Sequence, residues 1–101
     1  MGVVEKQNVE YSNEVRIDGQ EVAVLANFNA KGELRPVFLQ LEDEEQQRMR
    51  LKVYKIYSMK EEHEAAWPLI RYEIGLLIQG SIIRGELVYS VELHRWWLRR
   101  S

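Results

Sequence analysis

The sequence predicts an all-β domain, mainly antiparallel, folded as a small barrel or a strongly coiled sheet of five to seven strands. Apolar residues recur with a period close to two through most of the 101 residues, which is the pattern of strands with one buried face. Turn signals follow one another about every eight to twelve residues, as in other small all-β domains. Barrel closure would also remove the exposed edges that so many β-branched strands create.

The first expected strands meet at the Asp18-Gly19 pair, which lies between alternating apolar residues and tolerates the positive φ of a tight hairpin turn. The strand that follows is expected to place four residues on one face: Val22, Val24, Ala26 and Phe28. The next turn is expected at residues 27–32. There Gly32 would adopt the left-handed conformation, and Asn29 would hydrogen-bond to its own backbone.

The segment 34–41 alternates again, with Val37, Leu39 and Leu41 on one face. Pro36 cannot donate to a strand ladder, so we expect it at an edge or a bulge. The acidic run 42–45 predicts a solvated turn, because four adjacent carboxylates repel one another.

The segment 48–57 alternates through Val53 and then changes phase at Tyr54-Lys55, which predicts a β-bulge. A short helix is expected near residues 59–66, because Ser58 and Glu61 have the spacing of a capping box and a proline follows at position 68. Such a helix has two turns at most, and we expect it to cover one end of the sheet.

The segment 70–78 has apolar residues at every second position and a mixed set between them, so this strand is expected to be central and largely covered on both faces. Residues 79–81 predict a turn. The next strand is expected to point four residues inward: Leu87, Tyr89, Val91 and Leu93. In the last strand, alternation sends one of Trp96 and Trp97 inward and the other outward.

Composition indicates one cytoplasmic domain at residues 9–101, after a flexible N-terminus at residues 1–8. The chain has 16 acidic residues, 14 basic residues and no cysteine. Without cysteine, disulfides, thiolate metal sites, iron–sulfur clusters and a cysteine nucleophile are excluded. The longest uncharged stretch, residues 74–83, is half a membrane span. We therefore expect no membrane partner, no metal and no cofactor.

Catalysis is not expected either. In Glu62-His63-Glu64 the three potential metal ligands are adjacent, and neighbouring residues on a helix point in different directions. His94 and Glu73 are the candidate general bases. For both residues we favour a structural interpretation. We expect His94 to lie in a turn, and we expect Glu73 to pair with a basic group such as Arg71.

Several short segments form a recognisable pattern: Val22-Ala23-Val24-Leu25-Ala26-Asn27-Phe28, Gly32, Arg35-Pro36, Arg71-Tyr72 and Arg95-Trp96-Trp97. This pattern resembles a family of short uncharacterised β-rich proteins of Firmicutes bacteria. The spacing between the last two pairs is longer in this chain than in the family pattern. The resemblance implies a bacterial cytoplasmic protein with a small β fold, and it transfers no activity and no site.

Two functional hypotheses follow from the basic and aromatic residues. The first is a non-catalytic interaction module that binds a protein partner, or itself as a homo-oligomer, through an exposed aromatic and β-edge surface. Its expected contact residues are Arg71, Tyr72, Trp96 and Trp97. The second is a small barrel that binds single-stranded nucleic acid, with cations for the phosphates and aromatic rings for the bases. Its expected contact residues are Arg48, Arg50, Lys52, Tyr54, Arg95, Arg99 and Arg100, with Tyr54 or Lys55 brought to the basic face by the phase change.

Overall fold

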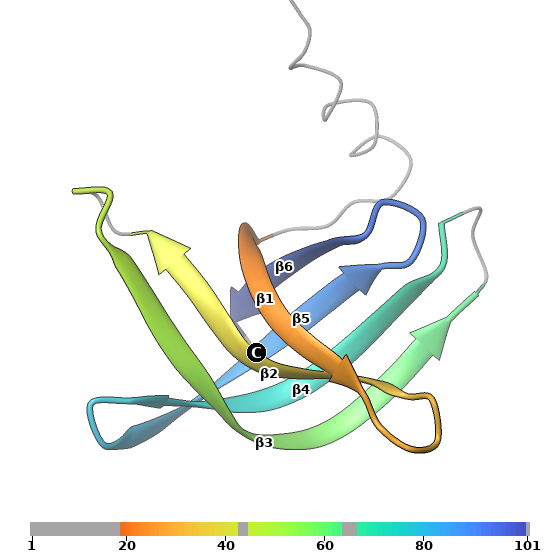
Figure 1. The fold of residues 1–101 in the computed structure, drawn as a ribbon, viewed down its shortest axis with the longest axis horizontal. Helices are drawn as coiled ribbons and strands as arrows, with labels where there is room; N and C mark the ends of the chain where they lie inside the picture. Colours follow the sequence, from red (N-terminus) through yellow and green to blue (C-terminus); the bar gives the residue numbers. More distant parts are fainter. Residues whose placement is uncertain (1–18, 43–44, 64–66, 101) are drawn as a thin grey trace, which may run out of the picture.

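The computed structural model describes residues 19–42, 45–63 and 67–100, and in these residues six strands form a closed barrel (Figure 1). The strands are β1 (Gln20–Phe28), β2 (Leu34–Glu42), β3 (Arg48–Glu62), β4 (Leu69–Ile78), β5 (Ser81–Ser90) and β6 (Arg95–Arg100). Each strand pairs antiparallel with the next, and β1 pairs with β6 to close the ring. The predicted antiparallel all-β fold of five to seven strands is therefore confirmed. Of the two architectures that the sequence left open, a small barrel or a strongly coiled sheet, the structure has the barrel. Residues 1–8 and the first arm of the hairpin expected before Gly19 lie outside the described residues.

Two of the predicted turns form as expected. In the β1–β2 turn, Oδ1 of Asn29 accepts hydrogen bonds from the backbone N–H groups of Lys31 and Glu33, both at 2.9 Å, and Gly32 has a φ of 81°. In the two-residue β4–β5 turn, Gln79 and Gly80 both have positive φ, at 50° and 81°. Positive φ at both positions is the type I′ geometry, which matches the twist of the flanking strands.

Three β-bulges curve the sheet. Val37 is the extra residue of β2, because Phe38 and Pro36 face consecutive residues of β1, and the predicted position of Pro36 beside a bulge is confirmed. Tyr54 is an extra residue of β3, because Val53 pairs with Leu76 and Lys55 with Gly75. The sequence predicted the bulge at Tyr54, but it did not predict the second bulge on β3, at Tyr57.

The predicted helix near residues 59–66 is wrong for its first half. Residues Met59 to Glu62 continue β3, where they pair with Tyr72 to Leu69 of β4. Residues 64–66 lie outside the described residues, and the described part of the chain contains no helix. A helix of two turns is marginal on its own, whereas pairing with β4 satisfies the backbone of this segment along an existing strand. That described part accordingly contains no helix long and apolar enough to cross a membrane.

The core fills the inside of the barrel. Its buried residues are Val22, Leu39, Leu51, Val53, Tyr72, Ile74, Leu76, Leu87 and Trp96. The expected alternation of inward and outward residues holds in the middle of the strands and fails at their ends. Phe28, expected on the inner face of β1, is 70% exposed, and Val91, expected to point inward, is 40% exposed in the turn before β6. The outer face of β4, expected to be largely covered, is covered only in part. Leu69 and Gly75 are buried there and Arg71 is half-buried, whereas Glu73 and Leu77 are exposed.

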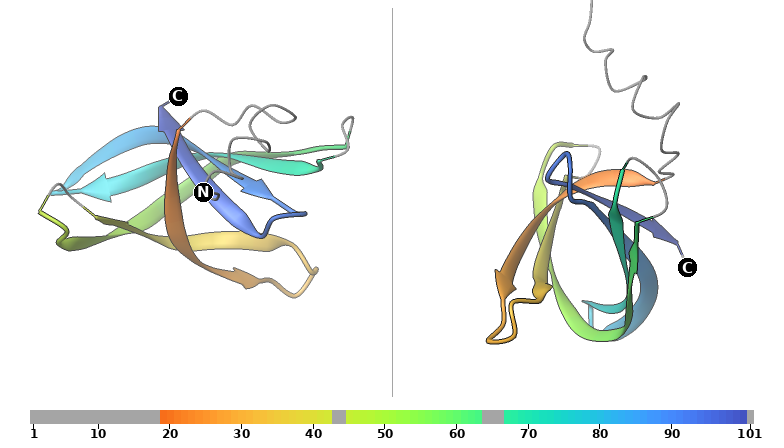
Figure 2. Two further views of the ribbon diagram at one scale, coloured as in Figure 1. Left: turned by 90° about the horizontal axis from the view of Figure 1, so that it is seen from above. Right: turned by 90° about the vertical axis from the view of Figure 1, so that its right-hand side faces the viewer.

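The barrel opens where the β1–β2 hairpin diverges from its neighbours (Figure 2). Among the described residues, β2 pairs with β3 only through Phe38–Glu42, and β1 pairs with β6 only through Gln20–Val22. The buried hydroxyl of Tyr72 donates a hydrogen bond to the carbonyl of Leu34, at the part of β2 that β3 does not reach. Tyr72 thus links β4 to β2 across this opening.

Candidate functional site

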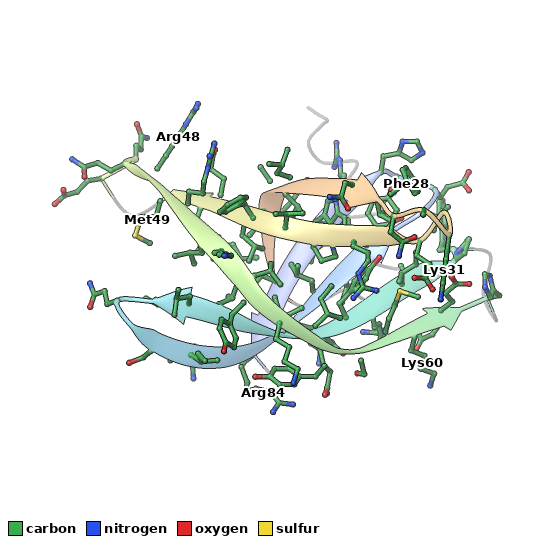
Figure 3. The ribbon with its side chains drawn as sticks, turned by 60° about the horizontal axis from the view of Figure 1, so that its bottom comes forward. Phe28, Lys31, Arg48, Met49, Lys60 and Arg84 are labelled. Atoms are coloured by element: carbon green, nitrogen blue, oxygen red, sulfur yellow. The ribbon has the colours of Figure 1, made fainter. Side chains whose placement is uncertain are left out.

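The basic side chains of β3 lie on the outside of the barrel. Leu51 and Val53 point inward, with 8% and 9% of their surface exposed, and Arg50 and Lys52 alternate with them and are exposed. Arg48, at the start of the strand, is exposed as well (Figure 3). The structure therefore brings these three predicted residues together on one outer face.

The bulge at Tyr54 extends this face along β3. Tyr54 follows the inward-facing Val53 and is 55% exposed. Because Tyr54 has no partner on β4, Lys55 pairs with Gly75 and is exposed too. The sequence left open which of the two residues joins the basic face, and both do.

Aromatic rings lie beside these cations. The guanidinium carbon of Arg50 lies 5.4 Å from the ring centroid of Phe38 on β2. On the other side of Lys52, the Tyr57 ring centroid lies 5.5 Å from Nζ of Lys55 and 3.9 Å from the guanidinium carbon of Arg84. Each of these is a cation–π contact on the outside of the sheet.

The register joins these residues into one surface. Lys52 is opposite Phe38 on β2 and opposite Leu77 on β4, and Leu77 is opposite Ile82 on β5. Residues directly opposite one another project to the same face of a sheet. We call this surface the basic–aromatic face and define it by Phe38, Arg48, Arg50, Lys52, Tyr54, Lys55, Tyr57 and Arg84.

Five residues of the basic–aromatic face are cationic, and Glu42 of β2 is directly opposite one of them, Arg48, in the register. The candidate base Glu73 lies beside the face, half exposed, with Oε1 3.5 Å from Nη2 of Arg84. The expected pairing of Glu73 with a basic group is confirmed, but the basic partner is Arg84 and not Arg71. Arg84 keeps 54% of its side-chain surface exposed and points away from the barrel (Figure 3).

Two open hollows adjoin the face on the side of β1 and β2. One has a volume of about 210 Å³ and is lined by Phe38, Gln40 and Arg50 together with Ala23 of β1. The other, of about 390 Å³, shares Ala23 and Gln40 with the first and reaches Arg48. Each hollow therefore has an arginine in its wall, and the larger one is also lined by Glu21.

The arginines of the C-terminal strand belong to a different surface. In the ring order, β6 is three strands away from β3 in either direction. Nε of Arg95 lies 3.5 Å from a carboxylate oxygen of Glu21, and Nε of Arg99 lies 3.2 Å from one of Glu86. Arg100 is exposed at the end of β6. The structure does not bring these three residues together with the basic strand.

The first set of predicted contact residues is mostly buried or paired. Tyr72 is fully buried and Trp96 is 8% exposed, with their ring centroids 5.7 Å apart, so neither side chain is accessible from outside. Trp97 is half-buried on the opposite face of β6, as alternation predicted. Nε of Arg71 lies 3.1 Å from Oε1 of Glu62, and Nη1 of Arg71 lies 3.6 Å from Oε1 of Glu86.

Burial raises the pKa of Tyr72 to about 12, and the nearby Arg35 guanidinium acts in the opposite direction. The desolvated phenolate is the unfavourable form, since the interior cannot replace its hydration. Tyr72 is therefore a neutral hydrogen-bond donor, which suits its structural link to Leu34.

The two histidines lie in turn or loop positions. His94 is exposed in the turn before β6 with a φ of 59°, and its ring centroid lies 6.5 Å from that of Tyr89. Nε2 of His63 lies 3.2 Å from Oε1 of Glu61. Within residues 19–42, 45–63 and 67–100, no three potential metal-ligating carboxylates or imidazoles come together.

Phe38, Tyr57 and Arg84 belong to the basic–aromatic face but were not predicted as site residues. The signal for Phe38 is in the sequence, because an inward Leu39 makes its neighbour point outward. Tyr57 depends on the second bulge, which alternation alone does not reveal. Arg84 reaches the face only through its register with Gly75.

No protein-family model, curated protein or solved structure matches this chain. The resemblance to the Firmicutes family therefore stays a prediction, and the function rests on the chemistry of the surface.

Proposed function

We propose that this protein is a non-catalytic binding module and that its basic–aromatic face binds single-stranded nucleic acid. The observation that carries the proposal is the row of outward cations on β3, Arg48, Arg50 and Lys52, followed at once by the exposed ring of Tyr54. Single-strand binders combine cations that follow the phosphate backbone with rings on which bases stack.

The spacing along β3 suits an extended, charged ligand. Every second residue of a strand is about 6.6 Å further along the same face. Arg50 and Lys52 therefore form a regular line of charges, which Arg48 and Lys55 extend at its two ends. The adjacent hollows of about 210 and 390 Å³ are open and bordered by arginine, so they suit part of an extended ligand better than an enclosed small molecule.

The two tyrosines of the face differ in what already covers them. The Tyr57 ring lies against Arg84 at 3.9 Å. Tyr54 is the more exposed of the two, at 55% against 37%. We therefore assign Tyr54 as the main stacking residue, with Phe38 and Tyr57 at the two sides of the cation row.

The decisive experiment is fluorescence anisotropy with a labelled single-stranded oligonucleotide at several salt concentrations. Lys52→Ala and Arg50→Ala are expected to weaken binding and to reduce the slope of log K against log salt by about 0.7 for each phosphate that is no longer neutralised. Lys31→Ala is the matched control, because Lys31 is exposed in the β1–β2 turn at a distance from Arg48 (Figure 3).

Two results would reject the proposal. One is the absence of binding to single strands at low salt. The other is an equal effect of Lys31→Ala and Lys52→Ala, which would indicate attraction to net charge without a site. Binding of an acidic polypeptide that oligonucleotides do not displace would indicate a protein partner on this face instead.

Tyr54→Ala tests the stacking part separately. Loss of one base–aromatic stack costs about 1–3 kcal/mol, which is about a 5- to 150-fold weaker affinity. The salt slope is expected to stay unchanged, because the cations that neutralise the phosphates are all still present. Tyr54→Phe keeps the ring and is expected to bind like the wild type; a Phe variant as weak as the Ala variant would contradict stacking.

A further inference from the structure

Several strand segments have one edge that no described strand pairs with. Leu34–Val37 of β2 and Arg48–Leu51 of β3 are two of them, and both contain arginine. Three more are Val24–Phe28 of β1, Tyr54–Glu62 of β3 and Ser81–Arg84 of β5. Unpaired edges offer backbone donors and acceptors to another strand, and proteins usually protect them with charges, bulges or short length. The three edges differ in this protection.

The edges of β3 and β5 are protected. The β3 edge contains the bulges at Tyr54 and Tyr57 and the exposed cations Lys55 and Lys60. Bulges twist an edge away from a flat partner, and lysines repel an identical edge. The β5 edge is four residues long, ends on Arg84 and lies next to Arg100, which pairs with Gly85.

The β1 edge lacks these protections. Its five residues, Val24-Leu25-Ala26-Asn27-Phe28, contain no charge and no extra residue, because the bulge of this hairpin lies on β2. Leu25 is 58% exposed and Phe28 is 70% exposed, more than any other large hydrophobic residue that the structure describes. The hairpin that carries the edge projects from the barrel, and Phe28 lies near its tip (Figures 2 and 3).

We propose that a second copy of this chain pairs with this edge, β1 against β1 and antiparallel about a two-fold axis near Ala26. The absence of charge is what selects a second copy, because identical edges bring identical side chains together and charged ones would repel. Val22 already pairs with Trp96 of β6, which limits the new ladder to Val24–Phe28.

The side-chain pattern of the edge is compatible with pairing to itself. With Ala26 opposite Ala26 of the second copy, Leu25 faces Asn27 and Val24 faces Phe28. Side chains that project to the same face are then opposite one another, as an antiparallel ladder requires. The pairing covers the exposed Leu25 and Phe28 of both copies and places the smallest side chain of the edge at the axis.

The test is size-exclusion chromatography with light scattering over a range of protein concentrations. The wild type is expected to form dimers. Leu25→Lys is expected to raise the dissociation constant by about tenfold or more, because two lysines would then be diagonal neighbours on the same face of the shared ladder, and charges protect a strand edge from pairing. Phe28→Lys is expected to act in the same direction. The matched control is Ile82→Lys, since Ile82 is 44% exposed on the β5 edge. Because Leu25 and Ile82 are both exposed, a lysine at either position leaves the core intact.

A chain that stays monomeric up to about 1 mM, the range of very weak association, would overturn the proposal. So would a dimer that Ile82→Lys weakens as much as Leu25→Lys does. The outcome is independent of nucleic-acid binding, since mass is measured without oligonucleotide.

Cross-linking tests the position of the axis. The chain contains no cysteine, so a single Ala26→Cys substitution introduces one thiol per copy. Residues directly opposite one another in an antiparallel pair have Cα atoms about 4.5–5.5 Å apart, within the range of a disulfide. Ala26→Cys is expected to form a disulfide dimer under mild oxidation much faster than Ser81→Cys, which places the thiol on the β5 edge. Equal rates would overturn the proposed pairing.

Discussion

The barrel has two groups of aromatic rings that differ in their surroundings. The inner group is Tyr72, Tyr89 and Trp96, in which Trp96 lies 5.7 Å from Tyr72 and 4.6 Å from Tyr89 between ring centroids. The outer group is Phe38, Tyr54 and Tyr57 on the basic–aromatic face, and two of its rings contact arginine. Rings packed on rings stabilise the fold, whereas rings on the outside of a sheet can contact cations and, where they are exposed as Tyr54 is, a ligand.

In these two groups, the direction in which a side chain points decides between packing and ligand contact more than its residue type does. Tyr72 is a strand tyrosine next to Arg71 in the sequence, yet it points inward and is fully buried. Tyr54 points outward. Substitutions in the two groups should therefore separate stability from binding.

Trp96→Ala is expected to have the largest effect. Truncation of a large buried aromatic residue costs about 3–5 kcal/mol, because burial is reduced and a cavity is left behind. The free energy of unfolding, measured by urea denaturation, should fall by that amount. Trp97→Ala is the matched control on the other face of the same strand, where the side chain is half-buried, and we expect a clearly smaller loss. Equal losses would contradict the inward assignment of Trp96.

Tyr72→Phe is expected to have the next largest effect. At neutral pH it removes the donor to the Leu34 carbonyl, and a buried acceptor left without its partner costs about 1–3 kcal/mol. The ring stays in place, so the core keeps its packing. Urea denaturation at pH 7 measures the difference.

The same pair of proteins predicts an alkaline effect. The pKa of Tyr72 is raised from 10.0 to about 12 in the folded state, so the unfolded chain loses this proton first as the pH rises. The stability contributed by the neutral hydroxyl is complete below pH 10 and is lost between about pH 10 and 12, at about 1.4 kcal/mol per unit. Tyr72→Phe has no such group. The difference in unfolding free energy between the two proteins should therefore shrink over this range, and a constant difference would contradict the raised pKa.

The fold could be predicted from local patterns. Alternation identified the strands, and the turns at Asn29–Gly32 and Gln79–Gly80 follow from residues that favour positive φ. The bulges at Val37 and Tyr54 left a trace in the sequence, as a proline and as a change of phase. These features depend on neighbours in the chain, so a single sequence contains them.

The helix and the site depended on distant contacts. The capping-box pattern of Ser58 and Glu61 is a local preference, which pairing with β4 overrides. The position of each strand around the barrel depends on the order in which the strands pair. The sequence therefore could not show that β3 and β6 are far apart in the ring, or that Arg84 lies beside Tyr57. It also could not show that Tyr72 and Trp96, both predicted to contact a partner, pack against each other.

Tyr57→Ala is expected to have a smaller effect on stability than the two core substitutions, and it tests the boundary between the two groups. The Tyr57 ring covers Gly75, because the place of a Cβ on this glycine would lie 3.0 Å from the Tyr57 hydroxyl and 3.2 Å from a ring carbon. The ring thus takes the space of the missing side chain, and Arg84 lies on it at 3.9 Å. Cross-strand and cation–π contacts of this kind contribute about 0.5–1 kcal/mol each. We expect Tyr57→Ala to lower the free energy of unfolding by about 1 kcal/mol in thermal or urea denaturation.

Tyr54 is the matched comparison for Tyr57, because it is the extra residue of the other β3 bulge and is more exposed. Tyr54→Ala is expected to change the unfolding free energy by less than about 0.5 kcal/mol, as is usual for exposed positions. Tyr57→Phe keeps the ring over Gly75 and should restore most of the stability. If both alanine variants left stability unchanged, Tyr57 would be as available to a ligand as Tyr54. If both were destabilised by the same amount, the outer rings would share the packing role of the inner group, and the exposed ring of Tyr54 would no longer favour a ligand.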